Sequence, residues 1–311
     1  MTTCVIGGAG FIGAHVTRGL VRSGRDVVVL GRRAEPDREL PPGVRYVSGD
    51  YGDLEVMRAL LKDTDEVIDL AYSTVPKSSF EDPIFDIVSN LPASVQLLRE
   101  AATVGVRRLV LVSSGGTVYG VAKSLPIRED HATNPISPYG ITKLTIEKYA
   151  GMFQRSTGLP VAIARPANAY GEDQHAFTGQ GFVATAMHSI IRGDAVGVFG
   201  GTGTTRDYVH VSDVAEGIVA ILERGVPGQA YNIGTGIGAS NLEVLAEIAP
   251  LANRAGCELR TTTLQSRSFD VPANVLDSSK LASQTGWQPK VDLRAGIQRT
   301  WDAALATHRR S

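Results

Sequence analysis

The stretch Gly7-Gly8-Ala9-Gly10-Phe11-Ile12-Gly13 decides which fold this sequence predicts. It follows a short apolar run, Thr3 to Ile6, and opens the segment Phe11 to Val21, whose apolar residues recur at helical spacing. The β-branched run Asp26 to Leu30 comes next. Glycines at positions 7, 10 and 13 permit a tight turn, a close approach of the backbone to a pyrophosphate, and close packing of helix on strand. In a strand–loop–helix–strand unit, this loop predicts a dinucleotide site at the helix N-terminus.

Short apolar runs separated by helical segments continue through the first half of the chain. They are Glu66 to Ala71, Arg108 to Ser113 and Val161 to Arg165. Apolar strands that alternate with helices predict an α/β fold of the Rossmann type, with a doubly wound parallel sheet. After about Pro166, glycine-rich loops such as "FGGTGTTRDY" and "NIGTGIG" replace this rhythm. We therefore expect a dinucleotide-binding domain over residues 1–165 and a smaller, loop-rich substrate region over residues 166–311. The boundary is soft, because Asp207 to Arg224 has the pattern of a helix that could pack back on the sheet.

Composition excludes several classes of function. The 31 Lys and Arg nearly balance the 32 Asp and Glu, which leaves no basic footprint for nucleic acid. No apolar stretch has the length that spans a bilayer, and the N-terminus lacks a signal-peptide pattern, so we expect a cytoplasmic protein without membrane contact. Cys4 and Cys257 lie far apart, and the six histidines have no metal-ligand spacing. We expect no metal site.

The residues after the second predicted strand bear on the choice of cofactor. This position carries Gly31-Arg32-Arg33, where sites that prefer NAD usually carry an acidic side chain. Without that carboxylate a 2′-phosphate meets no repulsion, and a guanidinium can bind the phosphate through two hydrogen bonds. The cofactor is therefore NAD or NADP, and Arg32 and Arg33 favour NADP. Two solvated surface arginines are an almost equally good interpretation.

A tyrosine and a lysine form the candidate catalytic pair. The segment "SPYGITKLTIEKY" places Tyr139 and Lys143 four residues apart, on one face of a helix. A free tyrosine titrates near pH 10, about three units above neutrality. A lysine ammonium, together with a positively charged nicotinamide ring, would favour the phenolate and lower that pKa. Tyr139 could then take a hydroxyl proton while hydride leaves for the nicotinamide.

Long motifs along the whole chain resemble those of the extended short-chain dehydrogenases/reductases. They include "GGAGFIGAHV", "LVLVSSGGTVYG", "SPYGITKLTIEKY", "RPANAYG", "TTRDYVHVSDVAEGI" and "SRSFDVPANVLDSSK". Within that superfamily the chain resembles the NAD-dependent epimerase/dehydratase family, and it is most similar to nucleotide-sugar epimerases of the UDP-glucose 4-epimerase type. Because the motifs are long, ordered and far apart, a chance match is negligible.

The residue patterns and the resemblance together predict two sets of site residues. The cofactor set, which includes Arg32, Arg33, Tyr139 and Lys143, also comprises Gly7, Gly10, Phe11, Ile12, Gly13, Asp50 (at the adenine), Tyr51, Leu70, Ala71, Asn90 and Pro166. The substrate set comprises Asn168, Arg206 and Arg267 on the diphosphate, Val198 and Phe199 at the uracil, Asp270 on the nucleoside ribose, and Val183.

One departure from the family pattern concerns a catalytic hydroxyl. The family usually carries Ser or Thr two residues before the threonine of its "S-x-T-V-Y" stretch, and that position is Gly115 here. Loss of such a donor would typically cost a few kcal/mol, roughly 3, unless another group replaces it. Thr117 and Ser114 are the candidates. We favour Thr117, because Ser114 should point to the opposite side of an extended segment. Both hydroxyls could also merely satisfy local backbone groups.

The leading hypothesis is an enzyme that epimerises a UDP-hexose or UDP-N-acetylhexosamine at C4 through a 4-keto intermediate. An NADPH-dependent reductase of a 4-keto nucleotide sugar is the alternative enzyme, which Arg32 and Arg33 favour. A non-catalytic dinucleotide-binding sensor or scaffold is the alternative of another class, and Gly115 is its only support. The helices expected near Asn90 to Thr103 and Tyr139 to Thr157 match those that pair in family homodimers, so the resemblance also implies a homodimer.

Overall fold

A seven-stranded parallel sheet forms the larger part of the molecule. The computed structural model describes residues 1–200, 203–265 and 271–309. The sheet has the strand order β10-β6-β5-β4-β1-β2-β3. Its strands are β1 (Thr2–Ile6), β2 (Asp26–Gly31), β3 (Arg45–Ser48), β4 (Glu66–Asp69), β5 (Arg108–Val112), β6 (Val161–Pro166) and β10 (Ala230–Ile233). Every pair in this sheet is parallel, which confirms the Rossmann-type fold.

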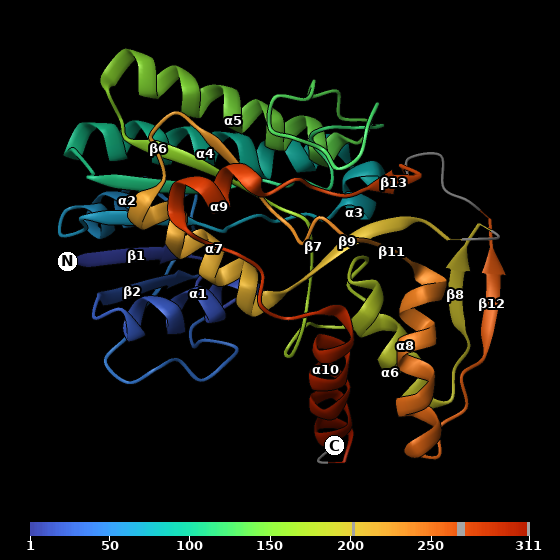
Figure 1. The fold of residues 1–311 in the computed structure, drawn as a ribbon. Coiled ribbons are helices and arrows are strands. Elements are labelled where there is room, and N and C mark those ends of the chain that lie inside the picture. Colours follow the sequence, from blue (N-terminus) through green and yellow to red (C-terminus); the bar gives the residue numbers. More distant parts are fainter. Residues whose placement is uncertain (201–202, 266–270, 310–311) are drawn as a thin grey trace.

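Helices cover both faces of this sheet (Figure 1). Helices α1 (Phe11–Arg22) and α7 (Val211–Arg224) lie on one face with α9 (Ser279–Thr285), and α2 (Leu54–Leu61), α4 (Pro83–Val104) and α5 (Pro138–Thr157) lie on the other. Successive strand residues point to opposite faces, so Val29 packs in one core and Val28 and Leu30 in the other. The inner strands β1, β4, β5 and β6 are buried on both sides under helices and are largely apolar, whereas the edge strand β3 is half exposed and carries Arg45 and Ser48.

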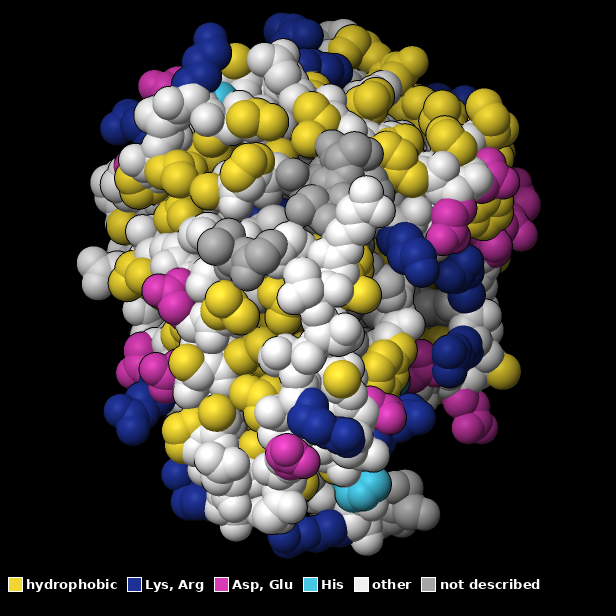
Figure 2. All heavy atoms as spheres, turned by 90° about the vertical axis from the view of Figure 1, so that its right-hand side faces the viewer, with side chains coloured by type: hydrophobic (Ala, Val, Ile, Leu, Met, Phe, Trp, Pro, Cys, Tyr) yellow, Lys and Arg dark blue, Asp and Glu magenta, His cyan; other side chains and the backbone are white. Residues whose placement is uncertain are grey.

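The remaining elements form a second, smaller layer (Figure 1). Strands β7 (Asn168–Tyr170), β9 (Thr205–His210), β11 (Gly238–Ser240) and β13 (Ala273–Asn274) form one small sheet, and β8 (Val196–Phe199) pairs with β12 (Thr261–Leu264). A third apolar core joins these strands to α6 (Phe182–Arg192), α8 (Asn241–Arg254) and α10 (Leu293–His308). Figure 2 shows this end of the molecule, where Lys and Arg alternate with Asp and Glu along the rim.

The segment Asp207 to Arg224 is not helical throughout, which corrects the expectation from sequence. Its first four residues belong to β9, and α7 begins at Val211. Asp207 is fully buried, and its carboxylate accepts hydrogen bonds from the backbone N–H groups of Thr235, Gly236 and Leu276. These tertiary bonds and the pairing of β9 with β7, β11 and β13 hold an extended backbone here. His210, the last residue of β9, caps this helix, and its imidazole Nδ1 accepts from the Ser212 N–H.

Residues beyond 165 contribute to both layers. Helix α7 packs on the same sheet face as α1, and β10 pairs with β6. The division of the chain at residue 165 stays a prediction. Among the described residues, none of the helices combines the length and the apolarity that crossing a bilayer would take.

Candidate active site

A cleft of about 1240 Å³ opens at the carboxyl ends of the parallel strands. Its wall on the side of the large sheet comes from the loops after β1, β4, β5 and β6, and from the start of α5. Its other wall comes from α3 (Pro76–Glu81), the start of α6, and strands β8 and β9. Ligands of open parallel sheets bind at these strand ends, because the loops there diverge and leave a crevice.

The glycine loop has the shape that a pyrophosphate requires. Gly7 has a φ of +78°, which L side chains rarely adopt, and a Cβ on it would lie 3.3 Å from the Ala71 nitrogen. A Cβ on Gly13 would collide with the Gly7 carbonyl oxygen and would lie 2.7 Å from the Gly8 Cα. Gly10 is the N-cap of α1 and has no side chain to cap it, so the first N–H groups of this helix remain available. Gly10, Phe11, Ile12 and Gly13 all line the cleft, and this cradle fits a dinucleotide.

Tyr139 and Lys143 face the same cleft from one side of α5. The helix begins with Pro138, and the Ser137 hydroxyl caps it by accepting from the Gly140 N–H at 3.1 Å. Lys143 is only 6% exposed, and its Nζ donates to the Val112 carbonyl oxygen at 2.9 Å. The same Nζ lies 5.9 Å from the centre of the Tyr139 ring. The two side chains therefore share one helix face, as the four-residue spacing predicts.

Burial is the main cause of the pKa shifts of Tyr139 and Lys143. It lowers the pKa of Lys143 to about 8, while the carboxylates of Asp69, Glu147 and Asp86 act in the opposite direction. Burial also raises the pKa of Tyr139 well above its ordinary value, and Asp86 raises it further. In the protein alone the phenol thus stays protonated. The lowering of its pKa that the sequence predicts would need the positive nicotinamide ring as well as the lysine.

Both candidate hydroxyls line the cleft. Ser114 does not point away from it, because residues 114–118 form a turn rather than an extended segment. In that turn the Ser114 carbonyl oxygen accepts from the N–H groups of Thr117 and Val118 at 3.3 and 3.2 Å. Ser114 therefore lies on the cleft side, and its expected place on the opposite side of an extended segment is wrong. The Thr117 Oγ1 is buried and has no hydrogen-bond partner among the described residues, so it is free to bind a ligand.

Other residues of the predicted cofactor set occupy two kinds of position. Leu70 and Pro166 line the cleft, and the Ala71 N–H donates to the Asp69 carboxylate beside the glycine loop. Asp50, Tyr51 and Asn90 lie outside the cleft lining and hold loops in place. The Asp50 carboxylate accepts from the Gly52 N–H, the Tyr51 hydroxyl donates to Asp69 at 2.8 Å, and the Asn90 amide oxygen accepts from the Ser73 N–H at 2.7 Å. Direct contacts of these three with a cofactor stay predictions.

The two arginines after β2 lie on the surface. Arg33 forms an ion pair with Asp37 at 2.5 Å, and its guanidinium side chain is 75% exposed. The Tyr46 hydroxyl donates to the Arg33 carbonyl oxygen at 2.9 Å and fills the space beside Gly31. Arg32 is exposed next to this loop. Neither arginine lines the cleft.

Four of the predicted substrate residues, Asn168, Val183, Phe199 and Arg206, line the far part of the cleft. Val198 does not, because β8 alternates and turns Val198 into the third core while Gly197 and Phe199 face the cleft. Arg206 is fixed by a hydrogen bond of 2.8 Å from its Nη1 to the Val271 carbonyl oxygen. Arg267 and Asp270 lie outside the described residues.

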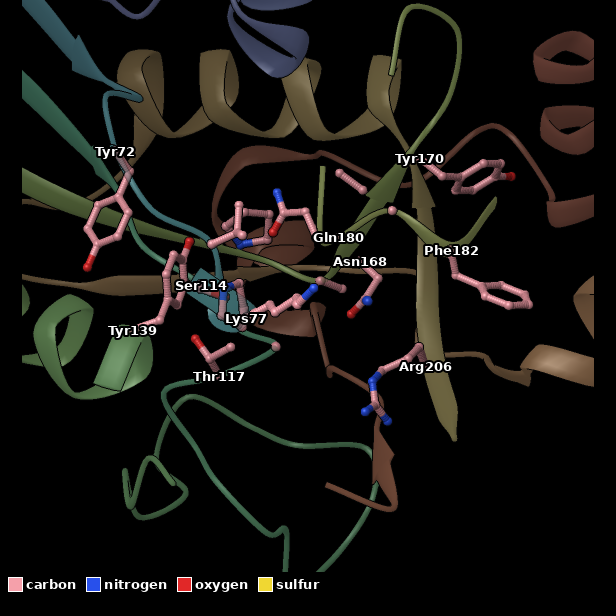
Figure 3. A pocket seen from close by; sticks show the side chains of 18 of the residues that line it. Tyr72, Lys77, Ser114, Thr117, Tyr139, Asn168, Tyr170, Gln180, Phe182 and Arg206 are labelled. Atoms are coloured by element: carbon pink, nitrogen blue, oxygen red, sulfur yellow. The ribbon is translucent and has the colours of Figure 1, made fainter. Parts of the chain in front are cut away.

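Two side chains that the sequence did not single out also reach the cleft (Figure 3). Tyr72 stands beside Tyr139, and Lys77 extends from α3 toward Asn168. Tyr72 follows the end of β4 by three residues, and strand ends of a parallel sheet are where ligand-binding residues gather. That position was the available signal for Tyr72. Lys77 lies on a short helix after this loop and gave no such signal.

Comparison with known proteins identifies relatives along nearly the whole chain. Residues 3–234 match the NAD dependent epimerase/dehydratase family. A UDP-glucose 4-epimerase from Mycolicibacterium smegmatis is 34% identical over 96% of this chain and 97% of its own length. Among solved structures, the UDP-glucose 4-epimerase of Thermotoga maritima with UDP-glucose has a TM-score of 0.93 at 32% identity, covering 99% of this chain and 100% of that one. The UDP-glucose 4-epimerase of Thermus thermophilus in complex with NAD has a TM-score of 0.89 at 34% identity, covering 98% and 99%.

Proposed function

Because the chain belongs to the NAD dependent epimerase/dehydratase family, we propose that it is a nucleotide-sugar 4-epimerase that acts on a UDP-hexose or UDP-N-acetylhexosamine. The observation that carries this proposal is the place of Tyr139 and Lys143. Both face one cleft, between the glycine loop and the end that holds Asn168 and Arg206. Relatives similar over nearly their full length are UDP-glucose 4-epimerases, and solved examples contain UDP-glucose or NAD.

Different residues of the cleft have different roles in the proposed reaction. A dinucleotide held by the glycine loop would supply the hydride chemistry at the sugar C4, with hydride returned to the opposite face of that carbon. Tyr139 takes the proton of the C4 hydroxyl and gives it back in the reverse step, and the Lys143 ammonium favours the phenolate. Thr117, or Ser114 beside it, donates a hydrogen bond to the reacting oxygen. The first helical turn of α1 binds the pyrophosphate of the cofactor.

The substrate is held at the end of the cleft away from the reacting group. In Figure 3, Arg206 and Asn168 lie on one side of the cleft and Tyr139 lies on the other. A guanidinium and an amide suit a diphosphate, which wants several hydrogen-bond donors. Binding energy concentrated on the nucleotide leaves the sugar loosely held, so that a 4-keto sugar can turn and present its second face.

We further propose that Arg32 and Arg33 allow the site to bind NADP as an alternative to NAD, the family's cofactor. Dissociation constants for both dinucleotides test this, and Arg32→Ala should weaken NADP by about tenfold, the effect of losing one charge-assisted contact. An affinity for NADP that is unchanged in Arg32→Ala would contradict it. The arginines also favour the alternative enzyme, an NADPH-dependent reductase of a 4-keto nucleotide sugar. A reductase would consume NADPH stoichiometrically.

A homodimer is the proposed assembly. Helices α4 and α5 pack on each other and present exposed apolar side chains, among them Ile84, Val88 and Met152. Apolar groups gathered on two neighbouring helices are typical of a protein interface. Sedimentation of a Val88→Glu, Met152→Glu variant should show a monomer where the unchanged chain sediments as a dimer. A cytoplasmic location stays a prediction.

Proton NMR of the purified protein tests the activity. UDP-glucose, UDP-galactose and their N-acetyl analogues are each added without cofactor, and the anomeric signal of the C4 epimer should appear for at least one pair. Tyr139→Phe should abolish this conversion while the protein keeps its thermal stability. Conversion by Tyr139→Phe at the original rate, or no conversion of any of the four sugars, would contradict the proposal. A sensor or scaffold would give the second result.

A further inference from the structure

Tyr72 is in contact with both members of the candidate catalytic pair. The centre of its ring lies 4.8 Å from that of Tyr139, at an interplanar angle of 68°, so the two rings meet edge to face. The Lys143 Nζ lies 4.0 Å from the centre of the Tyr72 ring, closer than the 5.9 Å to the Tyr139 ring. Figure 3 shows Tyr72 at the edge of the cleft next to Tyr139.

A buried carboxylate fixes the orientation of this ring. The Tyr72 hydroxyl donates to Asp86 Oδ1 at 3.3 Å, and Asp86 is fully buried in the first turn of α4. The other oxygen of Asp86 accepts from the Thr142 hydroxyl at 2.6 Å, and the Thr74 hydroxyl also donates to Asp86. Thr142 precedes Lys143 on α5. Asp86 thus ties the loop after β4 to the helix that carries the catalytic pair.

We propose that Tyr72 is a positioning residue that holds the Lys143 ammonium beside Tyr139 through the face of its ring. The inference rests on the proposed function, in which Lys143 must stay charged and directed at the reacting phenol. A cation over the face of an aromatic ring is attracted by its quadrupole, and the attraction grows where water is excluded. Lys143 is only 6% exposed, so water is largely excluded and the attraction between the ammonium and the ring is stronger than at a protein surface.

The neighbouring carboxylates favour the charged form of Lys143 through space, but their side-chain hydrogen bonds go to other groups. The charged and titratable groups that face Lys143 are Asp69 from β4, Asp86 from α4, and Glu147 and Tyr139 from α5. Asp69 binds the Tyr51 hydroxyl, Asp86 binds Thr142, and Glu147 binds Arg165.

The ring also leaves the donors of the ammonium available. A carboxylate in direct contact would draw the N–H groups of Lys143 into an ion pair. The face of an aromatic ring attracts the positive charge but does not use one of the N–H donors of Lys143 in a directed hydrogen bond. Lys143 can therefore keep its bond to Val112 and direct its remaining N–H groups into the cleft.

A comparison of Tyr72→Leu with Tyr72→Phe tests the inference. Leucine removes the ring but stays apolar, whereas phenylalanine keeps the ring and loses only the hydroxyl, which binds Asp86 and Thr142. The purified protein, with lysine labelled at Cε with ¹³C, is titrated by NMR, and Lys143→Arg identifies the signal. The pKa of Lys143, about 8 in the unchanged chain, should fall by about one unit in Tyr72→Leu. It should stay within about 0.3 unit in Tyr72→Phe.

Kinetics supply the second readout. In Tyr72→Leu, the fall of kcat at high pH should begin about one pH unit earlier, and kcat at the optimum should drop about tenfold with KM nearly unchanged. In Tyr72→Phe, kcat at the optimum and the pH at which kcat begins to fall should both match the unchanged chain. An unchanged Lys143 titration in Tyr72→Leu would overturn the inference, and so would a rise in KM alone, which would make Tyr72 a substrate contact.

Fluorinated ring variants keep the inference testable if Tyr72→Leu does not fold. Phenylalanine and pentafluorophenylalanine at position 72 have similar shapes, but fluorination reverses the charge of the ring face. The pKa of Lys143 should be lower with the fluorinated ring, and equal values would overturn the proposal. Because the NMR titration needs no substrate, it separates the two proposals. If the pKa of Lys143 shifts as expected but the protein epimerises none of the four sugars, only the proposed activity is contradicted.

Discussion

Leu276 occupies the space into which a side chain on Gly115 would have to project. A Cβ on Gly115 would contact Leu276 Cδ1 and would lie 2.8 Å from the Arg165 carbonyl oxygen. The backbone of Gly115 is fixed on both sides, since its N–H donates to the Pro166 carbonyl and its carbonyl accepts from Asn274. The direction of this Cβ is toward packed protein, and Gly115 does not line the cleft. The missing hydroxyl therefore cannot be restored at this position.

Gly115→Ser should destabilise the protein without raising its activity. The added atoms meet backbone and a buried leucine, and overpacking of this kind costs about 1–3 kcal/mol. Urea unfolding should show the loss, and kcat should not exceed that of the unchanged chain. Gly116→Ser is the matched control, because its Cβ would lie 3.4 Å from Asn168 Oδ1, an ordinary contact on the cleft side. An increase of kcat in Gly115→Ser would contradict this account of the loop.

Thr117→Val should lower kcat by about 100-fold, the usual effect of removing one hydrogen-bond donor from a reacting oxygen. Valine keeps the shape of the side chain and removes the Oγ1, which is buried in the cleft lining without a partner among the described residues. The free energy of unfolding should change little, because Oγ1 makes no hydrogen bond to the part of the chain that the structure describes. Steady-state rates of epimerisation give the measurement.

Ser114→Ala is the companion variant, since Ser114 lines the same part of the cleft. A loss of kcat in Ser114→Ala, with Thr117→Val fully active, would transfer the role to Ser114. Retained activity in the double variant would remove both from the mechanism.

The turn at residues 114–118 shows why sequence could name the two hydroxyls but not rank them. Direction along an extended segment follows from alternation alone. A turn instead depends on which carbonyl accepts which N–H, and here the Ser114 carbonyl serves both Thr117 and Val118. Two adjacent glycines allow several such patterns. The helical face of Tyr139 and Lys143 needed no such information, because a spacing of four places both on one side of any helix.

Longer-range partners explain the other differences. The residues of β9 have no strong local signal against a helix, and their extended form depends on partners such as Thr235 and Leu276, far away in the sequence. Val198 and Phe199 are both apolar, and only the packing of β8 on the third core decides which one faces the cleft. Strands β1, β2, β4, β5 and β6 were predictable because they are largely apolar, as burial on both faces requires, whereas β3 and β10 were not singled out from the sequence.

Glu147→Gln should cost about 3–5 kcal/mol of stability, the usual effect of leaving one member of a buried ion pair unpaired. Arg165 binds Glu147 through Nε at 3.0 Å and through Nη2 at 2.5 Å, and both side chains are more than nine-tenths buried. Urea unfolding gives the measurement. The apolar double variant Glu147→Leu, Arg165→Met should recover most of the loss, because neither charge then remains buried. A double variant as unstable as Glu147→Gln would show that shape, not charge, is what this site requires.

His15 should make the protein sensitive to mild acid. Burial is the main cause that lowers the pKa of His15 to about 4, with Arg18 adding to it, while Glu172 and Asp173 oppose and His210 lowers it slightly. Its Nε2 is buried and has no partner among the described residues. The folded protein therefore holds His15 neutral, whereas the unfolded chain takes a proton near pH 6.5. Protonation then favours the unfolded state, so stability should be complete above about pH 6.5 and should fall as the pH drops toward 4.

His15→Gln should remove this dependence. After allowance for solvent screening, the unchanged chain should lose about 1–2 kcal/mol between pH 7 and pH 4.5 through this residue. Urea midpoints at pH 7, 6, 5 and 4.5 give the measurement, and His175→Gln, at an exposed histidine, is the control. Glu172 does not interfere in this range. The hydrogen bond from His210 is the main cause that lowers the pKa of Glu172 from 4.5 to about 2, so its contribution is lost only below about pH 4.5. An equal loss of stability in His15→Gln and in the unchanged chain would show that another group takes up the proton.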